Sequence, residues 1–281
     1  MNDIKDPMTR VGVIFSSGFF GFFAHAGFLA ALREMGIRPC AWAGSSSGAI
    51  VAAFAASGMD DKGIRDYLFG VRREAFWDPY PWWQVAGKAL KGFKGLDGYL
   101  RGEAFMGLME VLPEKTFEDC PHPIAIAATN LTQRRETVFT SGDLRRAVCA
   151  SSSVPMLFRP VEIEGCLYVD GGVTSKAPIL GLLSIAKVDI VLIHFIASRG
   201  ISGTGNGFLK KAFTPWLIHD MSVDIARLES YRHQKSLAEK TGVRVVEIST
   251  GAPPVGPKSL HLGPSAYGHA RVEAARMLGG I

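Results

Sequence analysis

A serine flanked by glycines is the residue of this chain best suited to covalent chemistry. The pattern G-x-S-x-G is made by Gly44, Ser45, Ser46, Ser47 and Gly48. A short apolar run precedes it and an alanine-rich stretch follows it, so we expect a strand, a sharp turn and a helix. Such a turn exposes the central hydroxyl, and the N-terminus of the following helix favours developing negative charge. The pattern predicts that Ser46 is a nucleophile for acyl transfer; the alternative is an ordinary Gly/Ser-rich loop.

A carboxylate that could act as the base is Asp170, which closes an apolar run and precedes Gly171 and Gly172. The two glycines leave room for other backbone to approach the carboxylate, so Asp170 is placed to meet a second strand-end residue. The alternative is a common Asp-Gly turn. No histidine after Ser46 stands in a recognisable catalytic setting, and His194, in the middle of an expected strand, is more typical of a core residue. A Ser-His-Asp esterase or thioesterase remains an alternative.

The elements that must position these residues alternate between strands and helices. Apolar strands between helices predict an α/β protein with a mainly parallel sheet covered on both faces. We expect one domain over residues 1–281, with a variable insert at about 60–120. The strands are expected near 11–16, 40–43, 124–128, 136–140, 161–164, 167–169, 188–196 and 243–248. The helices are expected near 24–35, 48–57, 143–150, 215–240 and 264–278.

Composition narrows the class of protein. Among the 281 residues 47% are hydrophobic and 20% are charged, which predicts a sizeable core and little disorder. The net charge of +5 permits peripheral contact with an anionic membrane, while no basic stripe indicates nucleic-acid binding. Four cysteines are scattered without a C-x-x-C pattern, which favours a reducing, cytoplasmic compartment. No cluster has metal-ligand spacing, and the sequence carries no signal for oligomeric state.

One uncharged segment, residues 11–32, is long enough to suggest a transmembrane helix. It contains Ser16, Ser17, Gly18 and Gly21, which interrupt the apolar pattern. A strand, a glycine-containing loop and a helix explain the segment better than one spanning helix. We expect no secretory signal, because the N-terminus carries acidic residues and no small-residue cleavage site.

Four motifs in order give the chain a resemblance to a known family. They are the serine motif at 44–48, Ala127-Ala128-Thr129-Asn130-Leu131, the stretch 150–160 with Ala150-Ser151-Ser152-Ser153-Val154-Pro155, and Asp170-Gly171-Gly172. In this order, over about residues 11–200, they resemble the patatin-like phospholipases. The resemblance implies a three-layer α/β/α fold and a Ser–Asp dyad without a histidine or a cofactor. Ser46 would form the acyl-enzyme, and Asp170 would accept its proton and later activate water.

The resemblance also implies an oxyanion loop at residues 16–21, which departs from the family pattern. The family has G-G-G-x-[RK]-G, and this chain has Ser16-Ser17-Gly18-Phe19-Phe20-Gly21. Gly18 and Gly21 are kept, whereas the basic residue is replaced by Phe20. Backbone amides around Ser17, Gly18, Phe19 and Gly21 would still bind an oxyanion. Loss of one oxyanion donor typically costs ~10²–10³-fold in rate, so the altered loop predicts a slow enzyme.

Aromatic residues gather near the expected site, at 19–23 and 76–83, and the second group is followed by Lys88, Lys91, Lys94 and Arg101. This pattern suits an acyl-chain pocket or a lipid–water interface; the alternative is a packed cap over the sheet. The expected function is a serine hydrolase of lipid carboxylic esters, of phospholipase A, lysophospholipase or lipid-esterase type. A lipid-binding or regulatory protein with the same fold and little turnover is the alternative from another class.

Overall fold

The computed structural model describes residues 4–89, 95, 97–197 and 215–281. Its centre is an eight-stranded sheet in the order β10-β9-β1-β2-β4-β8-β7, with β5 paired to β4. The strands are β1 Val11–Phe15, β2 Ala41–Ser45, β4 Ile124–Asn130, β5 Arg135–Phe139, β7 Val161–Ile163, β8 Cys166–Val169, β9 Ile190–Ala197 and β10 Arg244–Gly251. A separate two-stranded sheet pairs β3 Gly98–Leu100 with β6 Met156–Phe158.

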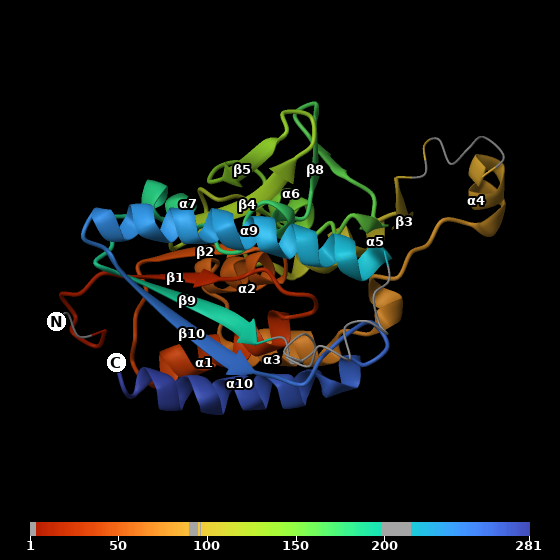
Figure 1. The fold of residues 1–281 in the computed structure, drawn as a ribbon. Coiled ribbons are helices and arrows are strands. Elements are labelled where there is room, and N and C mark those ends of the chain that lie inside the picture. The colour runs from red at the N-terminus through yellow and green to blue at the C-terminus, as the bar shows by residue number, and fades with distance from the viewer. Residues whose placement is uncertain (1–3, 90–94, 96, 198–214) are drawn as a thin grey trace, which may run out of the picture.

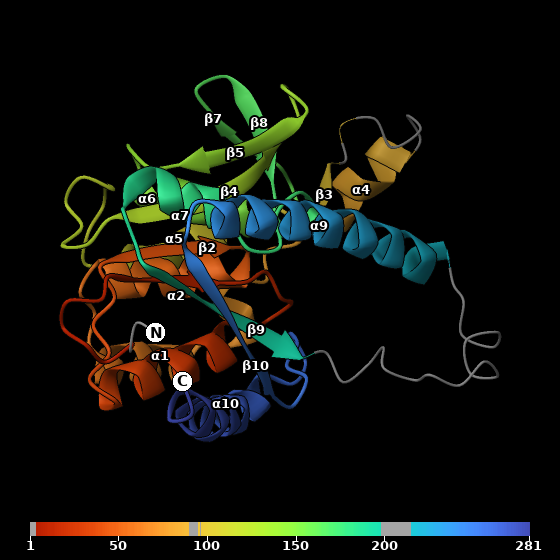
Figure 2. The same ribbon diagram turned by 60° about the vertical axis from the view of Figure 1, so that its left-hand side comes forward.

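The helices cover both faces of the large sheet, so the fold has three layers (Figure 1). They are α1 Phe22–Glu34, α2 Ser47–Ala56, α3 Asp61–Gly70, α4 Trp82–Ala89, α5 Glu103–Leu108, α6 Leu144–Ser151, α7 Ile179–Ile185, α9 Pro215–Lys240 and α10 Gly263–Leu278. Helices α1 and α10 lie on one face, and the long helix α9 crosses the other, as the turned view also shows (Figure 2). The expected α/β fold with a mainly parallel sheet is confirmed.

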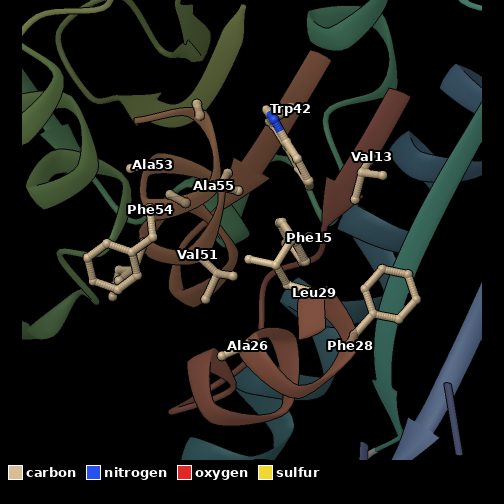
Figure 3. Packing of buried hydrophobic residues seen from close by; sticks show 14 of the residues in the cluster. Val13, Phe15, Ala26, Phe28, Leu29, Trp42, Val51, Ala53, Phe54 and Ala55 are labelled. Atoms are coloured by element: carbon tan, nitrogen blue, oxygen red, sulfur yellow. The ribbon is translucent and has the colours of Figure 1, made fainter. Parts of the chain in front are cut away.

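Alternation along the central strand explains the two layers of core. In β1, Val13 and Phe15 are buried with α1, α2 and α10, whereas Ile14 is buried with residues of α7 and α9. Successive side chains of a strand point to opposite faces, so one apolar strand supplies both cores. Phe15 stacks on Trp42 of β2 with ring centroids 6.0 Å apart, close to Leu29 of α1 (Figure 3).

Strand order at the centre of the sheet decides where loops meet. β1, β2, β4, β9 and β10 pair in parallel, while β8 joins β4 in the opposite direction. The carboxyl ends of the parallel strands therefore share one edge of the sheet. In an open parallel sheet this edge is where ligands bind.

The segment at 11–32 forms β1, a loop and α1, as expected. Within the part of the chain that the structure describes, we find no helix with the length and apolar character needed to cross a bilayer.

The insert at 60–120 is more regular than the sequence suggested. Helix α3 begins after Asp60, whose side chain accepts a hydrogen bond from the Gly63 amide at 2.6 Å, and it buries Ile64 and Leu68. The pairing of β3 with β6 and the short helix α7 were not expected either. Both depend on packing between distant segments, which local periodicity does not report.

Candidate active site

The serine motif forms a tight turn between β2 and α2. Ser46 has φ 56° and ψ −126°, a conformation that non-glycine residues rarely adopt. A Cβ at Gly44 would lie 2.4 Å from the carbonyl oxygen of Gly48, and a Cβ at Gly48 would lie 2.2 Å from that of Phe15. Both flanking positions therefore require glycine, because the helix backbone packs directly on the strands. The turn holds Ser46 at the carboxyl edge of the sheet.

Two serines at the end of α6 hold this strained turn in place. The Ser46 amide donates to the Ser151 hydroxyl at 2.9 Å, and that hydroxyl donates to the carbonyl of Ala127 at 2.6 Å. The Ser152 hydroxyl donates to the Ser46 carbonyl at 3.1 Å. A strained backbone conformation is kept only where many surrounding contacts hold it, and these hydrogen bonds provide such contacts. The sequence motif at 150–160 marked the segment but not this role.

Asp170 lies against the serine. The Ser46 hydroxyl donates to Asp170 Oδ2 at 2.6 Å, across 124 positions of sequence. The other carboxylate oxygen accepts the Gly172 amide at 2.7 Å. Both side chains are buried, with Ser46 8% and Asp170 6% exposed. Burial raises the pKa of Asp170 to about 6, against the hydrogen bonds from Ser46 and Gly172, which lower it.

The glycines after Asp170 fit closely between neighbouring segments. A Cβ at Gly171 would lie 2.1 Å from the carbonyl oxygen of Ala127, and a Cβ at Gly172 would lie 2.8 Å from Cβ of Ser17. The aspartate motif therefore packs against both β4 and the loop at 16–21. A side chain at either position would collide with these neighbours.

The loop at 16–21 lies next to the serine motif. The Ser17 amide donates to the carbonyl of Lys176 at 2.8 Å, whereas the amides of Gly18 and Phe19 make no hydrogen bond to the described residues. A Cβ at Gly21 would lie 2.9 Å from Ser47 Oγ and 2.2 Å from Ile196 Cδ1, so a larger residue there would displace these side chains. Phe20 has φ 51°, a left-handed conformation. The structure thus brings Ser17, Gly18, Phe19 and Gly21 close to the serine motif. The Gly21 amide donates to the Gly18 carbonyl at 3.2 Å, so of these four amides only those of Gly18 and Phe19 lack an acceptor among the described residues.

Behind this loop lies a buried pair of histidines. His25 of α1 and His194 of β9 are fully buried, and their Nδ1 atoms are 2.7 Å apart. His25 Nε2 is 2.9 Å from the Ser16 carbonyl oxygen, and the Ser16 amide donates to the His194 carbonyl at 3.1 Å. Neither ring is hydrogen-bonded to Ser46 or Asp170. The pair supports the loop from the core side, and His194 is a buried core residue, as its position in a strand suggested.

A known protein family matches the part of the chain that carries these residues. The family description "Patatin-like phospholipase" matches residues 13–183, which include the loop, the serine motif and the aspartate motif. The chain belongs to the patatin-like phospholipase family. An NTE family protein of Mycobacterium tuberculosis, described as uncharacterised, is 29% identical over 192 residues, covering 68% of this chain and 49% of the relative. A protein of Mycosarcoma maydis called lysophospholipase NTE1 is 27% identical over 221 residues, covering 73% of this chain and 11% of the relative.

The chain thus spans half or less of these relatives. Among solved structures, VipD from Legionella pneumophila matches with a TM-score of 0.49 and 15% identity, covering 98% of this chain and 67% of VipD. The type III effector ExoU matches with a TM-score of 0.46 and 17% identity, covering 98% of this chain and 53% of ExoU.

An apolar cleft opens from Ser46 in this patatin-like chain. Its empty space, including the part open to solvent, is about 710 Å³. Its walls come from the loop at 16–21, α2, α3, α5 and the 152–158 segment. Phe19, Phe20, Phe22 and Phe76 line it, together with Ile50, Leu68, Val71, Leu108, Val154, Leu157 and Phe158.

The aromatic residues at 76–83 lie in two different environments. Phe76 lines the cleft, while Trp82 and Trp83 do not and are 77% and 61% exposed. Of the basic residues after this segment, Lys91 and Lys94 lie outside the described residues. The alternative of a packed cap fails for Trp82 and Trp83, which are surface residues.

An arginine that the sequence did not single out supports the aspartate motif of this patatin-like chain. Arg227 of α9 donates to the Gly172 carbonyl at 3.1 Å and pairs with Asp224 at 2.6 Å. Burial raises the pKa of Asp170, and the positive charge of Arg227 lowers it in part. No local pattern identifies this role, because α9 reaches the site only through the packing of the second helical layer.

Proposed function

We propose that this protein hydrolyses carboxylic esters of lipids through Ser46 and Asp170, without a histidine base. The observation that carries the proposal is the 2.6 Å hydrogen bond from the Ser46 hydroxyl to a buried carboxylate. Family membership supports lipid-ester chemistry, and the names of the NTE relatives point in the same direction.

In the proposed first step Ser46 Oγ attacks the ester carbonyl while Asp170 takes the hydroxyl proton. A base works best when its pKa lies near the operating pH, and burial raises the pKa of Asp170 to about 6. The tetrahedral oxyanion would accept hydrogen bonds from the amides of Gly18 and Phe19, and from that of Ser47 at the start of α2. Backbone amides donate whatever the side chain is, so a loop that contains serines in place of glycines would still bind the oxyanion.

In the proposed second step the tetrahedral intermediate collapses and the carbon–oxygen bond of the alcohol breaks. Asp170 returns the proton to the departing alkoxide, and an acyl-Ser46 ester remains. Water then attacks this ester, and Asp170 again takes the proton. The bond between the acyl carbon and Ser46 Oγ breaks, Asp170 returns the proton to Ser46 Oγ, and the carboxylic acid leaves.

The acyl chain would occupy the apolar cleft, whose lining is described above. Exposed Trp82, Trp83 and Phe19 support peripheral contact with a lipid surface, because aromatic side chains favour that interface. Four free cysteines support a reducing, cytoplasmic setting.

A second candidate is a lipid-binding protein of this family with little turnover. It is favoured by one observation: Phe20, in a strained left-handed conformation, occupies the loop position where the family has a basic residue. This candidate predicts that lipids bind in the cleft and that esters are hydrolysed at the background rate.

The deciding experiment measures hydrolysis of p-nitrophenyl esters and of lysophospholipids by wild type and Ser46→Ala, together with labelling by a fluorophosphonate probe. We expect wild-type turnover, with labelling at Ser46 by mass spectrometry, and neither in the variant. Turnover retained by folded Ser46→Ala would refute the proposed nucleophile. Lipid binding without turnover or labelling would favour the second candidate.

A further inference from the structure

A second pocket lies at the same edge of the sheet as Ser46 and has no part in the proposed chemistry. Two distant segments form it, one around η1 Arg73–Ala75 and the other following β10 and leading into η4 Leu260–Leu262. Its empty space, including the part open to solvent, is about 780 Å³. The lining consists of Arg73, Trp77, Tyr99, Gly256, Pro257, Lys258 and Ser259.

The pocket gathers positive charge without a balancing carboxylate. Neither Arg73 nor Lys258 forms an ion pair with the residues that the structure describes, and no acidic side chain is among the lining. Arg73 Nε is buried and has no hydrogen-bond partner among the described residues. A buried donor without a partner is costly, so its persistence points to a ligand that accepts this hydrogen bond.

The remaining lining suits a phosphate. The Ser259 hydroxyl oxygen accepts the Gly256 amide at 2.9 Å, which leaves the hydroxyl proton free to donate to a ligand. The Arg73 guanidinium lies 4.0 Å from the centroid of the Trp77 ring, which fixes its plane. A planar arginine fork, a lysine ammonium and a hydroxyl together match the oxygens of a phosphate group.

The arginine and the two aromatic residues stand on a rigid support. The backbone amide of Trp77 donates to the Arg73 carbonyl at 3.0 Å, and Tyr80 is bonded to the carbonyl of Tyr99 at 3.4 Å. The Asp78 carboxylate accepts the amides of Gly102 and Ala104, both at 3.1 Å. The pocket wall is therefore held in place independently of any ligand.

One aromatic wall separates this pocket from the acyl cleft. Phe76 lines the cleft, and its ring centroid lies 6.3 Å from that of Trp77, which lines the second pocket. Tyr99 is 53% exposed, and α4 begins with exposed Trp82 and Trp83 shortly after Trp77. Exposed aromatics beside unpaired cations are typical of a surface that meets phospholipid headgroups.

We infer that this pocket binds the phosphate of a phospholipid headgroup at the surface from which the acyl cleft is filled. The inference rests on the proposed function, because it assigns the anionic part of a lipid whose ester would be cleaved at Ser46. It makes phosphate-bearing lipids better substrates than neutral glycerides.

The first test measures vesicle binding in the Ser46→Ala background, which prevents hydrolysis. Sedimentation compares vesicles of phosphatidylcholine with vesicles of equal parts phosphatidylcholine and phosphatidylglycerol. We expect Arg73→Gln/Lys258→Gln to weaken binding to the anionic vesicles about thirtyfold, because each cation near an anionic surface contributes about a factor of five. The matched control is Lys187→Gln/Arg276→Gln, which removes the same charge from exposed positions away from the pocket and should change binding far less.

The second test compares hydrolysis of lysophosphatidylglycerol and monoacylglycerol by enzymes that retain Ser46. The double variant should lower the ratio of the two kcat/KM values, and the control variant should leave the ratio unchanged. If the double variant fails to fold, Lys258→Gln alone is tested, because Lys258 is exposed and its replacement should leave the fold intact. This single variant should weaken vesicle binding about fivefold.

Equal losses of vesicle binding in the double variant and its control would overturn the inference, as would an unchanged substrate ratio in folded protein. A third test measures the binding of inorganic phosphate. If wild type binds phosphate saturably, and the double variant loses this binding but still binds vesicles as wild type does, the pocket is a free-phosphate site instead. If wild type hydrolyses no ester at all, the proposed function is refuted, and the vesicle arm alone decides whether the pocket recognises headgroups.

Discussion

His25 and His194 meet through their Nδ1 atoms in the dry interior, 2.7 Å apart, and this contact defines the proton on each ring. His25 Nε2 faces the Ser16 carbonyl, which only accepts, so His25 carries its proton on Nε2 and His194 donates from Nδ1. His194 Nε2 then accepts from the Thr250 hydroxyl at 2.8 Å. Both rings are neutral in this arrangement, and their full burial disfavours the charged form of either ring.

The first prediction concerns stability in acid. Burial lowers the pKa of His25 to about 3, and burial together with His25 lowers that of His194 well below its usual range. Because the folded pKa values lie below the unfolded value of about 6.5, stability is full above that pH and falls as the pH drops below it. The slope is about 1.4 kcal/mol per pH unit for each histidine.

Denaturant unfolding between pH 7.5 and 5 measures this slope. His25→Gln retains a donor for the Ser16 carbonyl but cannot be protonated, so the variant should show a shallower slope than wild type. An equal slope in the two proteins would show that His25 does not stay neutral in the fold.

The second prediction separates the strain at Ser46 from its chemistry. Ser46 has φ 56°, which glycine adopts without strain. Ser46→Gly should therefore be about 1 kcal/mol more stable than Ser46→Ala, after the greater chain entropy of unfolded glycine is subtracted. Urea unfolding of the two variants measures the difference. A less stable glycine variant would contradict a strained turn.

The third prediction concerns Asp170 as the base. Asp170→Asn should lower kcat by orders of magnitude, because an amide cannot take the serine proton. In wild type, kcat/KM should rise with pH through about 6, where Asp170 ionises, and level off above it. The control is a set of histidine variants, each of which should keep this acid limb. A limb that one histidine substitution abolishes would instead indicate a Ser-His-Asp mechanism.

The fourth prediction concerns Arg227, whose charge lowers the pKa of Asp170. Arg227→Met should move the acid limb of kcat/KM to higher pH by less than about one unit, because burial dominates the pKa of Asp170. Arg227→Lys keeps the charge and should hold the limb near its wild-type position with a lower kcat, because the bond to the Gly172 carbonyl is disturbed. A pH profile that both variants leave unchanged would limit Arg227 to a structural role.

The fifth prediction concerns the acyl cleft. Ile50 lies on α2, one helical turn beyond Ser46, and lines the cleft. The kcat/KM for an ester should rise roughly fourfold with each methylene added to its acyl chain, the equivalent of ~0.8 kcal/mol, until the cleft is filled. Ile50→Trp should stop this rise at a shorter chain while acetate esters remain substrates, and Ile50→Val is the conservative control. A chain-length series that Ile50→Trp leaves unaltered would place the acyl chain elsewhere.

Local chemistry in the sequence determined the parts of the fold that depend on short segments. The apolar runs became β1, β2, β4 and β9, and the glycines of the serine motif required a tight turn because no side chain fits there. The patatin-like family could be identified for the same reason, since its motifs are short and occur in a defined order. The chemistry of Ser46 and Asp170 could be hypothesised from their types and neighbours alone.

The tertiary structure alone decided which of these residues meet. Ser45 lies opposite Ala127 across the β2–β4 pair, and Thr129 lies opposite Val169 across the β4–β8 pair. This register brings the ends of β2 and β8 together on β4, and hence Ser46 to Asp170. Packing between segments far apart in the chain also produces the hydrogen bonds of Ser151 and Ser152 to Ser46, the histidine pair and the contact of Arg227 with Gly172. Such contacts depend on strand order and helix layering, which no local pattern of residues specifies.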